Sequence, residues 1–177
     1  LLSKDKQSLI MGILNVTPDS FSDGGKYFEK NTAIEHALKM IKNGADIIDI
    51  GGESTRPFSD PVSLDEELSR VIPVIEGIRK KSDVCISIDT TKSVVASKAL
   101  NVGASIINDV SAMEVDPLMA DVAIQFNCPL IIMHMKGTPK NMQDNPKYES
   151  LISDIKDYLV GRIDFALSKG VERKKII

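Results

Sequence analysis

The side chains best suited to chemistry in this 177-residue chain are concentrated in residues 15–25, Asn-Val-Thr-Pro-Asp-Ser-Phe-Ser-Asp-Gly-Gly. The proline, the polar residues and the closing glycine pair indicate a loop, and a polar loop that leaves a buried strand commonly carries function. Asp19 and Asp23 supply carboxylate oxygens of the kind that bind Mg²⁺, and Phe21 is an apolar group suited to covering a ligand. The alternative is a solvated connection without a site, which describes most polar loops.

Polar residues end five successive apolar runs of the chain. They are Asn15, Asp49 with the loop residues 53–56, Asp89, Asn108 with Asp109, and His134. Taken singly, such residues are commonly caps and turn formers. Because the carboxyl ends of parallel barrel strands meet at one mouth, five such ends together favour a binding or catalytic site.

The residue types indicate the ligand of this site. Asp89 offers acceptor oxygens and Asn108 a mixed donor and acceptor amide, a pair suited to a flat heterocycle with several N–H and ring-nitrogen groups. Thr55 and Arg56 suit a phosphate, since a hydroxyl and a forked cation both bind its oxygens. Asn15 is placed to hold a magnesium ion that is bound mainly by substrate phosphates. The sequence therefore predicts a polar heterocycle that carries a diphosphate.

Short apolar runs and amphipathic segments alternate along the chain. The runs predict strands at residues 8–14, 46–51, 84–88, 105–107 and 130–133, and a sixth run begins at Lys175. The segments between and after them predict helices at residues 32–43, 64–78, 93–100, 116–126 and 148–169. Capping-box patterns at Thr32 and Ser63 mark two of the helix starts. Pro73 should kink or restart the second helix.

Strands that alternate with helices predict a parallel sheet, which occurs as an open doubly wound sheet or as a closed barrel. The open sheet is usually marked by a glycine-rich phosphate turn, and no such turn is present. A barrel needs about 250 residues. We therefore predict an α/β fold, in which residues 1–177 form one incomplete TIM (β/α)₈ barrel domain, truncated after five β/α units at the start of strand six. We expect this segment alone to be poorly stable because its strand edges are open.

Composition excludes several classes of protein. Apolar residues make up 42%, charged residues 27%, and the net charge is −3, without the basic excess of a nucleic-acid binder. The apolar runs are too short to span a membrane, and residues 1–6 lack the apolar core of a signal peptide. Cys85 and Cys128 form neither a disulfide framework nor a zinc pattern. We expect a cytoplasmic protein without nucleic-acid or membrane partners.

Residues 15–25 closely resemble the first signature of the dihydropteroate synthases, folate-pathway enzymes with a TIM-barrel fold. Residues 51–57, Gly-Gly-Glu-Ser-Thr-Arg-Pro, resemble the second signature, and residues 87–90, 107–109 and 133–137 match further family positions. The likeness covers essentially the whole chain. In this family 6-hydroxymethyl-7,8-dihydropterin diphosphate reacts with 4-aminobenzoate to give 7,8-dihydropteroate and pyrophosphate. The resemblance also implies a homodimer.

The resemblance implies a role for residues on all five strand ends. Asn15 would bind the Mg²⁺ on the diphosphate, and Thr55 would contact the diphosphate itself. Asp89 and Asn108 would recognise the pterin, and Met133 would line the pterin pocket.

The two loops would supply the groups around pyrophosphate and the arylamine. Phe21 and Asp23 from the first loop, with Arg56 and Pro57 from the second, would order around pyrophosphate and shape the aminobenzoate pocket. Asp23 and Arg56 are the expected catalytic groups. No protein nucleophile is needed, because the electron-rich pterin stabilises a cationic methylene as the C–O bond breaks. His134, a lone histidine between two methionines, is expected to be structural.

The later motifs of the family are absent from these 177 residues. They are an Asp-Pro-Gly segment on strand six, a lysine from strand seven and an Arg-x-His pair after strand eight. We therefore expect the activity to belong to the parent protein rather than to this segment. Two alternatives are a methyltetrahydrofolate:corrinoid methyltransferase, whose substrate lacks the diphosphate that residues 55–56 suit, and a non-catalytic pterin-binding paralogue, which these residues do not exclude.

Overall fold

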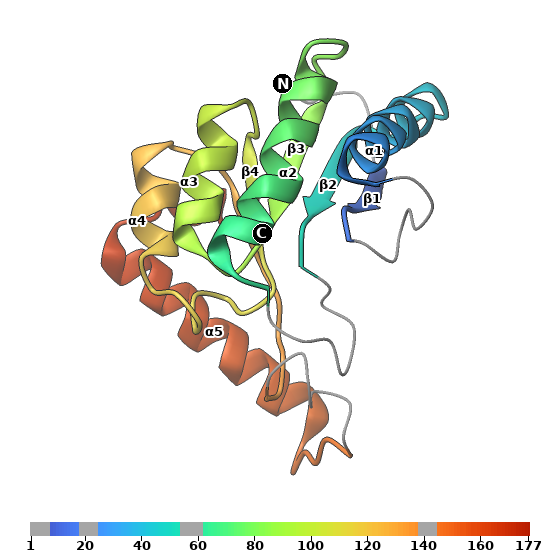
Figure 1. Cartoon of the computed structure of the whole chain (residues 1–177). Helices are drawn as coiled ribbons and strands as arrows, with labels where there is room; N and C mark the ends of the chain where they lie inside the picture. Colours follow the sequence, from blue (N-terminus) through green and yellow to red (C-terminus); the bar gives the residue numbers. More distant parts are fainter. Residues whose placement is uncertain (1–7, 18–24, 54–61, 138–144) are drawn as a thin grey trace.

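The computed structural model describes residues 8–17, 25–53, 62–137 and 145–177. Within these ranges one sheet contains five parallel strands: β1 (Met11–Asn15), β2 (Ile47–Gly51), β3 (Cys85–Asp89), β4 (Ile106–Asp109) and β5 (Leu130–Ile132). The helices are α1 (Gly25–Lys42), α2 (Leu64–Arg79), α3 (Ser93–Asn101), α4 (Met119–Gln125) and α5 (Leu151–Lys169), followed by a 3₁₀ turn at Arg173–Lys175. The first four helices each connect consecutive strands (Figure 1).

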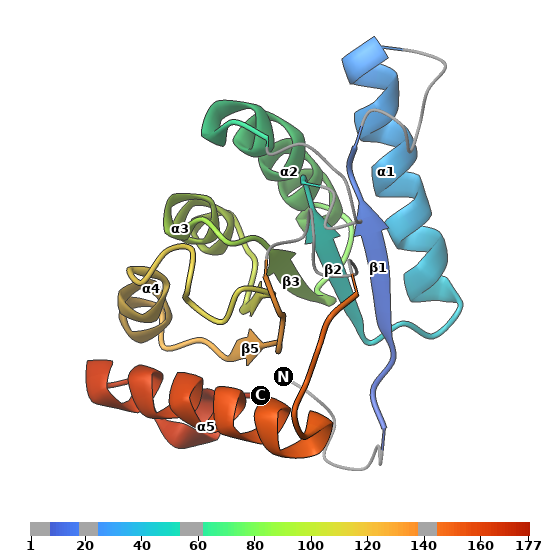
Figure 2. The ribbon, with the colours of Figure 1, turned by 90° about the horizontal axis from the view of Figure 1, so that it is seen from below.

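The order of the strands distinguishes the two architectures that the sequence allows. Neighbouring strands follow chain order, β1-β2-β3-β4-β5, whereas a doubly wound sheet reverses its order at a switch point. The helices lie around one side of the curved sheet (Figure 2), as in the wall of a barrel. Ile176 forms a parallel bridge with Leu130 of β5, which is where the sequence predicted the start of a sixth strand.

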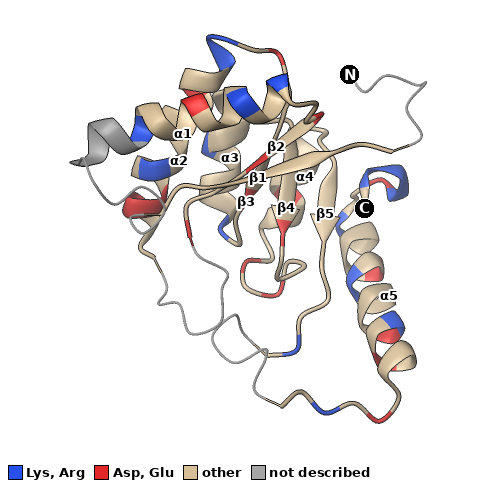
Figure 3. Cartoon of the chain, turned by 90° about the vertical axis from the view of Figure 1, so that its right-hand side faces the viewer, with Lys and Arg blue, Asp and Glu red and all other residues tan. Residues whose placement is uncertain are grey.

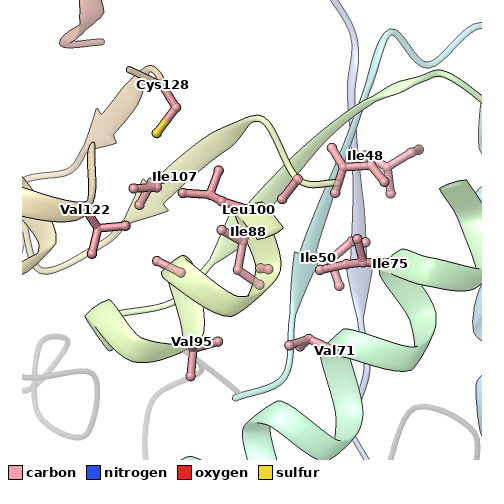
Figure 4. Packing of buried hydrophobic residues seen from close by; sticks show 14 of the residues in the cluster. Ile48, Ile50, Val71, Ile75, Ile88, Val95, Leu100, Ile107, Val122 and Cys128 are labelled. Carbon is pink, nitrogen blue, oxygen red and sulfur yellow. The ribbon is translucent and has the colours of Figure 1, made fainter. Parts of the chain in front are cut away.

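The apolar core lies between the sheet and the helices. Ile48 and Ile50 of β2 pack with Val71 and Ile75 of α2, and Ile88 of β3 belongs to the same cluster (Figure 4). All five of these side chains are completely buried. Ile48 and Ile50 occupy alternate positions of β2, so Asp49 between them faces the opposite side of the sheet.

Several helix boundaries differ from the prediction. α1 begins at Gly25, so the helix start predicted at Thr32 is wrong. A Thr-x-x-Glu pattern is also tolerated inside a helix. Threonine destabilises a helix by only about 0.5 kcal/mol relative to alanine, and glutamate is a good helix former. Ser63 is the N-cap of α2, as predicted, and accepts a hydrogen bond from the backbone N–H of Glu66 at 3.3 Å. α2 continues through Pro73 without restarting.

α4 begins at Met119, three residues after the predicted start at Asp116. The carboxylate of Asp116 accepts hydrogen bonds from the backbone N–H groups of Leu118, at 3.1 Å, and of Ser93, at 2.8 Å. Ser93 is the first residue of α3, so Asp116 caps a neighbouring helix as well as the turn that precedes α4. α5 begins three residues after the predicted Tyr148.

Both cysteines are free thiols. Cys128 belongs to the apolar core, where burial raises the pKa of its thiol to about 11. Cys85 of β3 lies 3.3 Å from the hydroxyl oxygen of Ser105. Across the described ranges, no helix combines the length and the apolar character that crossing a lipid bilayer requires.

The close packing of α1 against α2 gives a test of the core. A Cβ atom on Gly77 of α2 would lie 2.2 Å from Cδ1 of the buried Ile34. We expect Gly77→Ala to lower the free energy of unfolding by about 1–3 kcal/mol through overpacking. The matched control is Gly161→Ala on α5, where no atom lies within 4 Å, and which should raise stability by about 0.5–1 kcal/mol through helix propensity. Equilibrium urea denaturation measures both, and stabilisation by Gly77→Ala would contradict the packing described.

Candidate functional site

The strand register brings three predicted site residues into one row. Asn15 of β1 pairs with Gly51 of β2, which pairs in turn with Asp89 of β3. Asp89 pairs with Asn108 of β4, and Asn108 with Ile131 of β5. Paired residues of parallel strands point to the same face of a sheet. Asn15, Asp89 and Asn108 therefore share the face opposite the helices, at the carboxyl ends of their strands.

A second polar group lies one row deeper. Asp49 pairs with Ser87 on the same face, and the Asn108 amide Nδ2 donates a hydrogen bond to Oδ2 of Asp49 at 3.0 Å. The other oxygen of Asp49 and the Ser87 hydroxyl are buried and have no hydrogen-bond partner among the described residues. An unpaired buried polar atom costs about 1–3 kcal/mol. The surface formed by Asp49, Ser87, Asp89 and Asn108, here called the acidic floor, is therefore suited to a ligand that offers hydrogen-bond partners.

Gly51 leaves room for two converging oxygen atoms. A Cβ atom at this position would lie 3.3 Å from Oδ2 of Asp89 and 3.7 Å from Oδ1 of Asn15. Carboxylate and amide oxygens are the donors that Mg²⁺ prefers, so the donor chemistry fits the predicted metal. Within the described part of the chain no group of three His, Cys, Asp or Glu residues could hold a metal ion. The amide oxygen of Asn15 therefore suits an ion whose other ligands come from substrate phosphates.

The interior face is acidic. The five strands contain aspartates but neither lysine nor arginine, whereas the helices carry both signs of charge (Figure 3). Burial raises the pKa of Asp89 to about 7, and the neighbouring carboxylates Asp49, Glu67, Asp109 and Glu53 add to that rise. Burial also raises the pKa of Asp49, with partial compensation by the side chains of Ser87 and Asn108. Such a surface favours a ligand rich in N–H donors, as the residue types predicted.

Asp109 adjoins Asn108 in sequence but belongs to the opposite face. Its carboxylate is completely buried and accepts hydrogen bonds from the backbone N–H and hydroxyl of Ser111, at 2.9 and 2.7 Å, and from the backbone N–H of Met113, at 2.7 Å. These bonds fix the turn that follows β4. Asp109 is therefore a turn-forming residue, the alternative that the sequence left open for each strand end.

Two residues that directly follow β5, Met133 and His134, have different surroundings. Met133 directly follows the strand and is 38% exposed at the edge of the sheet where the polar row ends. His134 packs edge-on against Tyr158 of α5, with ring centroids 4.9 Å apart, and lies 5.9 Å from Tyr148. The packing of His134 against α5 agrees with the structural role expected for it.

Five predicted site residues lie outside the described part of the chain: Phe21, Asp23, Thr55, Arg56 and Pro57. The described residues do locate the points from which both segments depart. The backbone N–H of Val16 donates to the carbonyl of Gly51 at 2.8 Å, so β1 and β2 stay paired up to those points. Thr17 and Glu53, the last described residues before the two segments, follow the ends of β1 and β2 that belong to the polar row.

Two polar residues of the site, Asp49 and Ser87, were not among the predicted site residues. The sequence named Asp49 among the polar residues near strand ends but assigned it no role, and β2 ends at Gly51, as predicted. Both residues lie two positions before the last residue of a strand. A polar side chain in this position, on the face opposite the buried isoleucines, is the signal that finds them.

The raised pKa of Asp89 predicts a pH-dependent cost to folding. When the pKa of an acid rises on folding, its ionisation destabilises the folded protein. The free-energy cost of burying Asp89 is therefore absent below about pH 4 and complete above about pH 7. We expect Asp89→Asn to raise the free energy of unfolding by about 1–3 kcal/mol at pH 8, allowing for partial solvent screening, and by almost nothing at pH 4. Urea denaturation at both pH values measures this.

The control for that experiment is Asp164→Asn on the exposed face of α5, which should change stability by less than about 0.5 kcal/mol at either pH. The same effect of Asp89→Asn at pH 4 and pH 8 would contradict the electrostatic account.

Comparison with known proteins is consistent across sequence and structure. A sequence model of the family described as pterin binding enzyme matches residues 11–177. The dihydropteroate synthase of Bacillus subtilis (strain 168) is 51% identical over 176 residues, covering 99% of this chain and 59% of the relative. The chain spans about 60% of the length of the bacterial synthases that it matches.

Two solved structures show the same fold. The Clostridium difficile dihydropteroate synthase, determined in the presence of pteroic acid, matches with a TM-score of 0.90 and 46% identity, over 99% of this chain and 65% of that one. The Xanthomonas albilineans dihydropteroate synthase with 4-aminobenzoic acid matches with a TM-score of 0.87 and 41% identity, over 95% and 59%. The predicted fold class and family resemblance are confirmed, and the chain corresponds to part of such a barrel.

Proposed function

This chain belongs to the family of pterin binding enzymes, and we propose that the protein in which it occurs is a dihydropteroate synthase. It would condense 6-hydroxymethyl-7,8-dihydropterin diphosphate with 4-aminobenzoate, giving 7,8-dihydropteroate and pyrophosphate. The observation that carries the proposal is the register that sets Asn15, Asp89 and Asn108 in one row. The 51% identity to the Bacillus subtilis synthase supports it.

The pterin would lie against the acidic floor. Its ring N–H and amino groups would donate to Asp89, and the amide of Asn108, held on one side by Asp49, would turn its oxygen toward the heterocycle. The unpaired oxygen of Asp49 and the hydroxyl of Ser87 would receive further polar groups or bridging water from below. Because donors stabilise the carboxylate form of Asp89, pterin binding should release a proton near pH 7.

The diphosphate would lie above Gly51. Asn15 would hold the Mg²⁺ that accompanies it, and Thr55 and Arg56 would bind the phosphate oxygens. Mg²⁺, when bound, would neutralise charge on the departing pyrophosphate. The residues of this chain would keep the diphosphate at the strand ends while the pterin is fixed below, so that the C–O bond between them is the one that breaks.

The second substrate would enter through the two loops. Phe21, Asp23, Arg56 and Pro57 would shape the aminobenzoate pocket and exclude water from the cationic methylene, and Met133 would line the pterin side. The Xanthomonas albilineans synthase with 4-aminobenzoic acid supports this choice of arylamine.

The proposal further includes Mg²⁺ as the cofactor, a cytoplasmic location, assembly as a homodimer and sensitivity to sulfonamides that compete with 4-aminobenzoate. These four parts rest on the resemblance of residues 15–25 and 51–57 to the family signatures.

The test uses the full-length product of the gene that encodes this chain. We expect it to form dihydropteroate from the two substrates and to bind the pterin in calorimetry. Asp89→Ala should weaken pterin binding by at least about 100-fold, because a charged acceptor is removed from a buried site. Asn15→Ala should raise the Mg²⁺ concentration needed for half-maximal activity, and Asp164→Asn is the control for both.

The outcomes separate the candidate functions. Pterin binding without product would favour the non-catalytic paralogue, and methyl transfer to a corrinoid would favour the methyltransferase. Unchanged pterin affinity in Asp89→Ala would remove this residue from the site.

A further inference from the structure

A partly buried ion-pair network lies at the carboxyl ends of β2 and β3. Lys92 Nζ donates to a carboxylate oxygen of Glu53 and, at 2.5 Å, to Oε2 of Glu67. The hydroxyl of Thr90 donates to Oε1 of Glu67 at 2.6 Å. The side chain of Glu67 is only 1% exposed. A carboxylate persists at such a position because both of its oxygens have donors and a cation lies beside it.

The same helix holds the backbone before Glu53. Arg70 of α2 donates through Nη1 to the carbonyl of Gly52 at 2.7 Å. A Cβ atom on Gly52 would lie 2.8 Å from Cγ1 of Val71, so α2 packs directly against this glycine. Glu53 then follows with its side chain on Lys92. It is the last described residue before residues 54–61, and Thr55, Arg56 and Pro57, which the proposed function assigns to the phosphate and to the aminobenzoate pocket, follow it closely in the sequence.

The network also carries charge that acts on the site. Four carboxyls raise the pKa of Asp89 through their charge: Asp49 of β2, Glu67 of α2, Asp109 of β4 and Glu53 after β2. Lys92 is the cation that binds two of them. Burial lowers the pKa of Lys92, but its hydrogen bonds to Glu53 and Glu67 outweigh that effect and raise the pKa above its ordinary value. Lys92 therefore stays charged at neutral pH.

We propose that Lys92 is a positioning residue for the reaction of this site. Its ammonium group fixes Glu53 against Glu67, and it offsets the negative charge that these two residues place beside Asp89. The inference rests on the proposed function. Lys92 acts through its two partners, so it affects arylamine use through the position of Glu53 and pterin binding through the ionisation of Asp89.

Three variants of the full-length protein separate these two effects. Lys92→Met leaves two uncompensated glutamates, which should raise the pH midpoint of pterin binding by about one unit and lower kcat/KM for 4-aminobenzoate about tenfold. Lys92→Met combined with Glu67→Gln restores the net charge but leaves Glu53 unanchored. It should return the midpoint to the wild-type value while kcat/KM stays low. Lys98→Met, an equal change of charge on an exposed part of α3, should alter neither.

Calorimetry of pterin binding across pH 5–9 and steady-state kinetics provide the two measurements, and urea denaturation reports stability. A merely structural Lys92 would reduce stability and leave the pH midpoint unchanged in every variant, which would overturn the inference. If Lys92→Met does not fold, the double variant decides, since wild-type kcat/KM in it would exclude the positioning role. A wild-type protein that forms no dihydropteroate would refute the proposed function, while its pH-dependent pterin binding would still test the electrostatic half.

Discussion

The register of the parallel sheet is the constraint on which the site depends. Ile48, Ile50 and Ile88 are completely buried against the helices, and burial of each such side chain contributes about 1.5–3 kcal/mol. Because side chains alternate with a period of two, a slip of one residue would expose these isoleucines and turn Asp49 and Asp89 toward the helices. The apolar face thus determines where the polar residues point, although no isoleucine of that face belongs to the site.

The stability gained on one face of the sheet offsets a cost on the other. Two buried polar atoms, on Asp49 and Ser87, lack partners within the described residues, and Asp89 ionises only near neutral pH. Each feature opposes folding in the absence of a ligand. Natural proteins break local rules of packing and pairing mainly at functional sites. The concentration of these costs in two adjacent rows is therefore independent support for a binding site at that place.

Much of the fold and part of the site could be predicted from local pattern. The alternation of strands and helices, and the row containing Asn15, Asp89 and Asn108, follow from polar residues that end apolar runs. Helix starts were less predictable, because a capping residue shows that its side chain will accept a backbone hydrogen bond but not which helix will donate it. Asp116 shows this, since its carboxylate caps α3 through Ser93 while α4 begins further on.

The ion-pair network shows why the rest of the site needed the fold. Glu67 lies on the face of α2 that also carries Val71 and Ile75, so helical periodicity alone places a charge on a buried stripe. A charge there must be paired, because an isolated buried carboxylate would destabilise the fold. Its partner could not be inferred, because Lys92 lies 25 residues after Glu67 in the sequence. Glu53, the third member, lies 14 residues before Glu67, and the three meet only when β2, α2 and β3 are assembled. A glutamate on an apolar helix face therefore predicts that a network exists, and the fold is needed to identify its members.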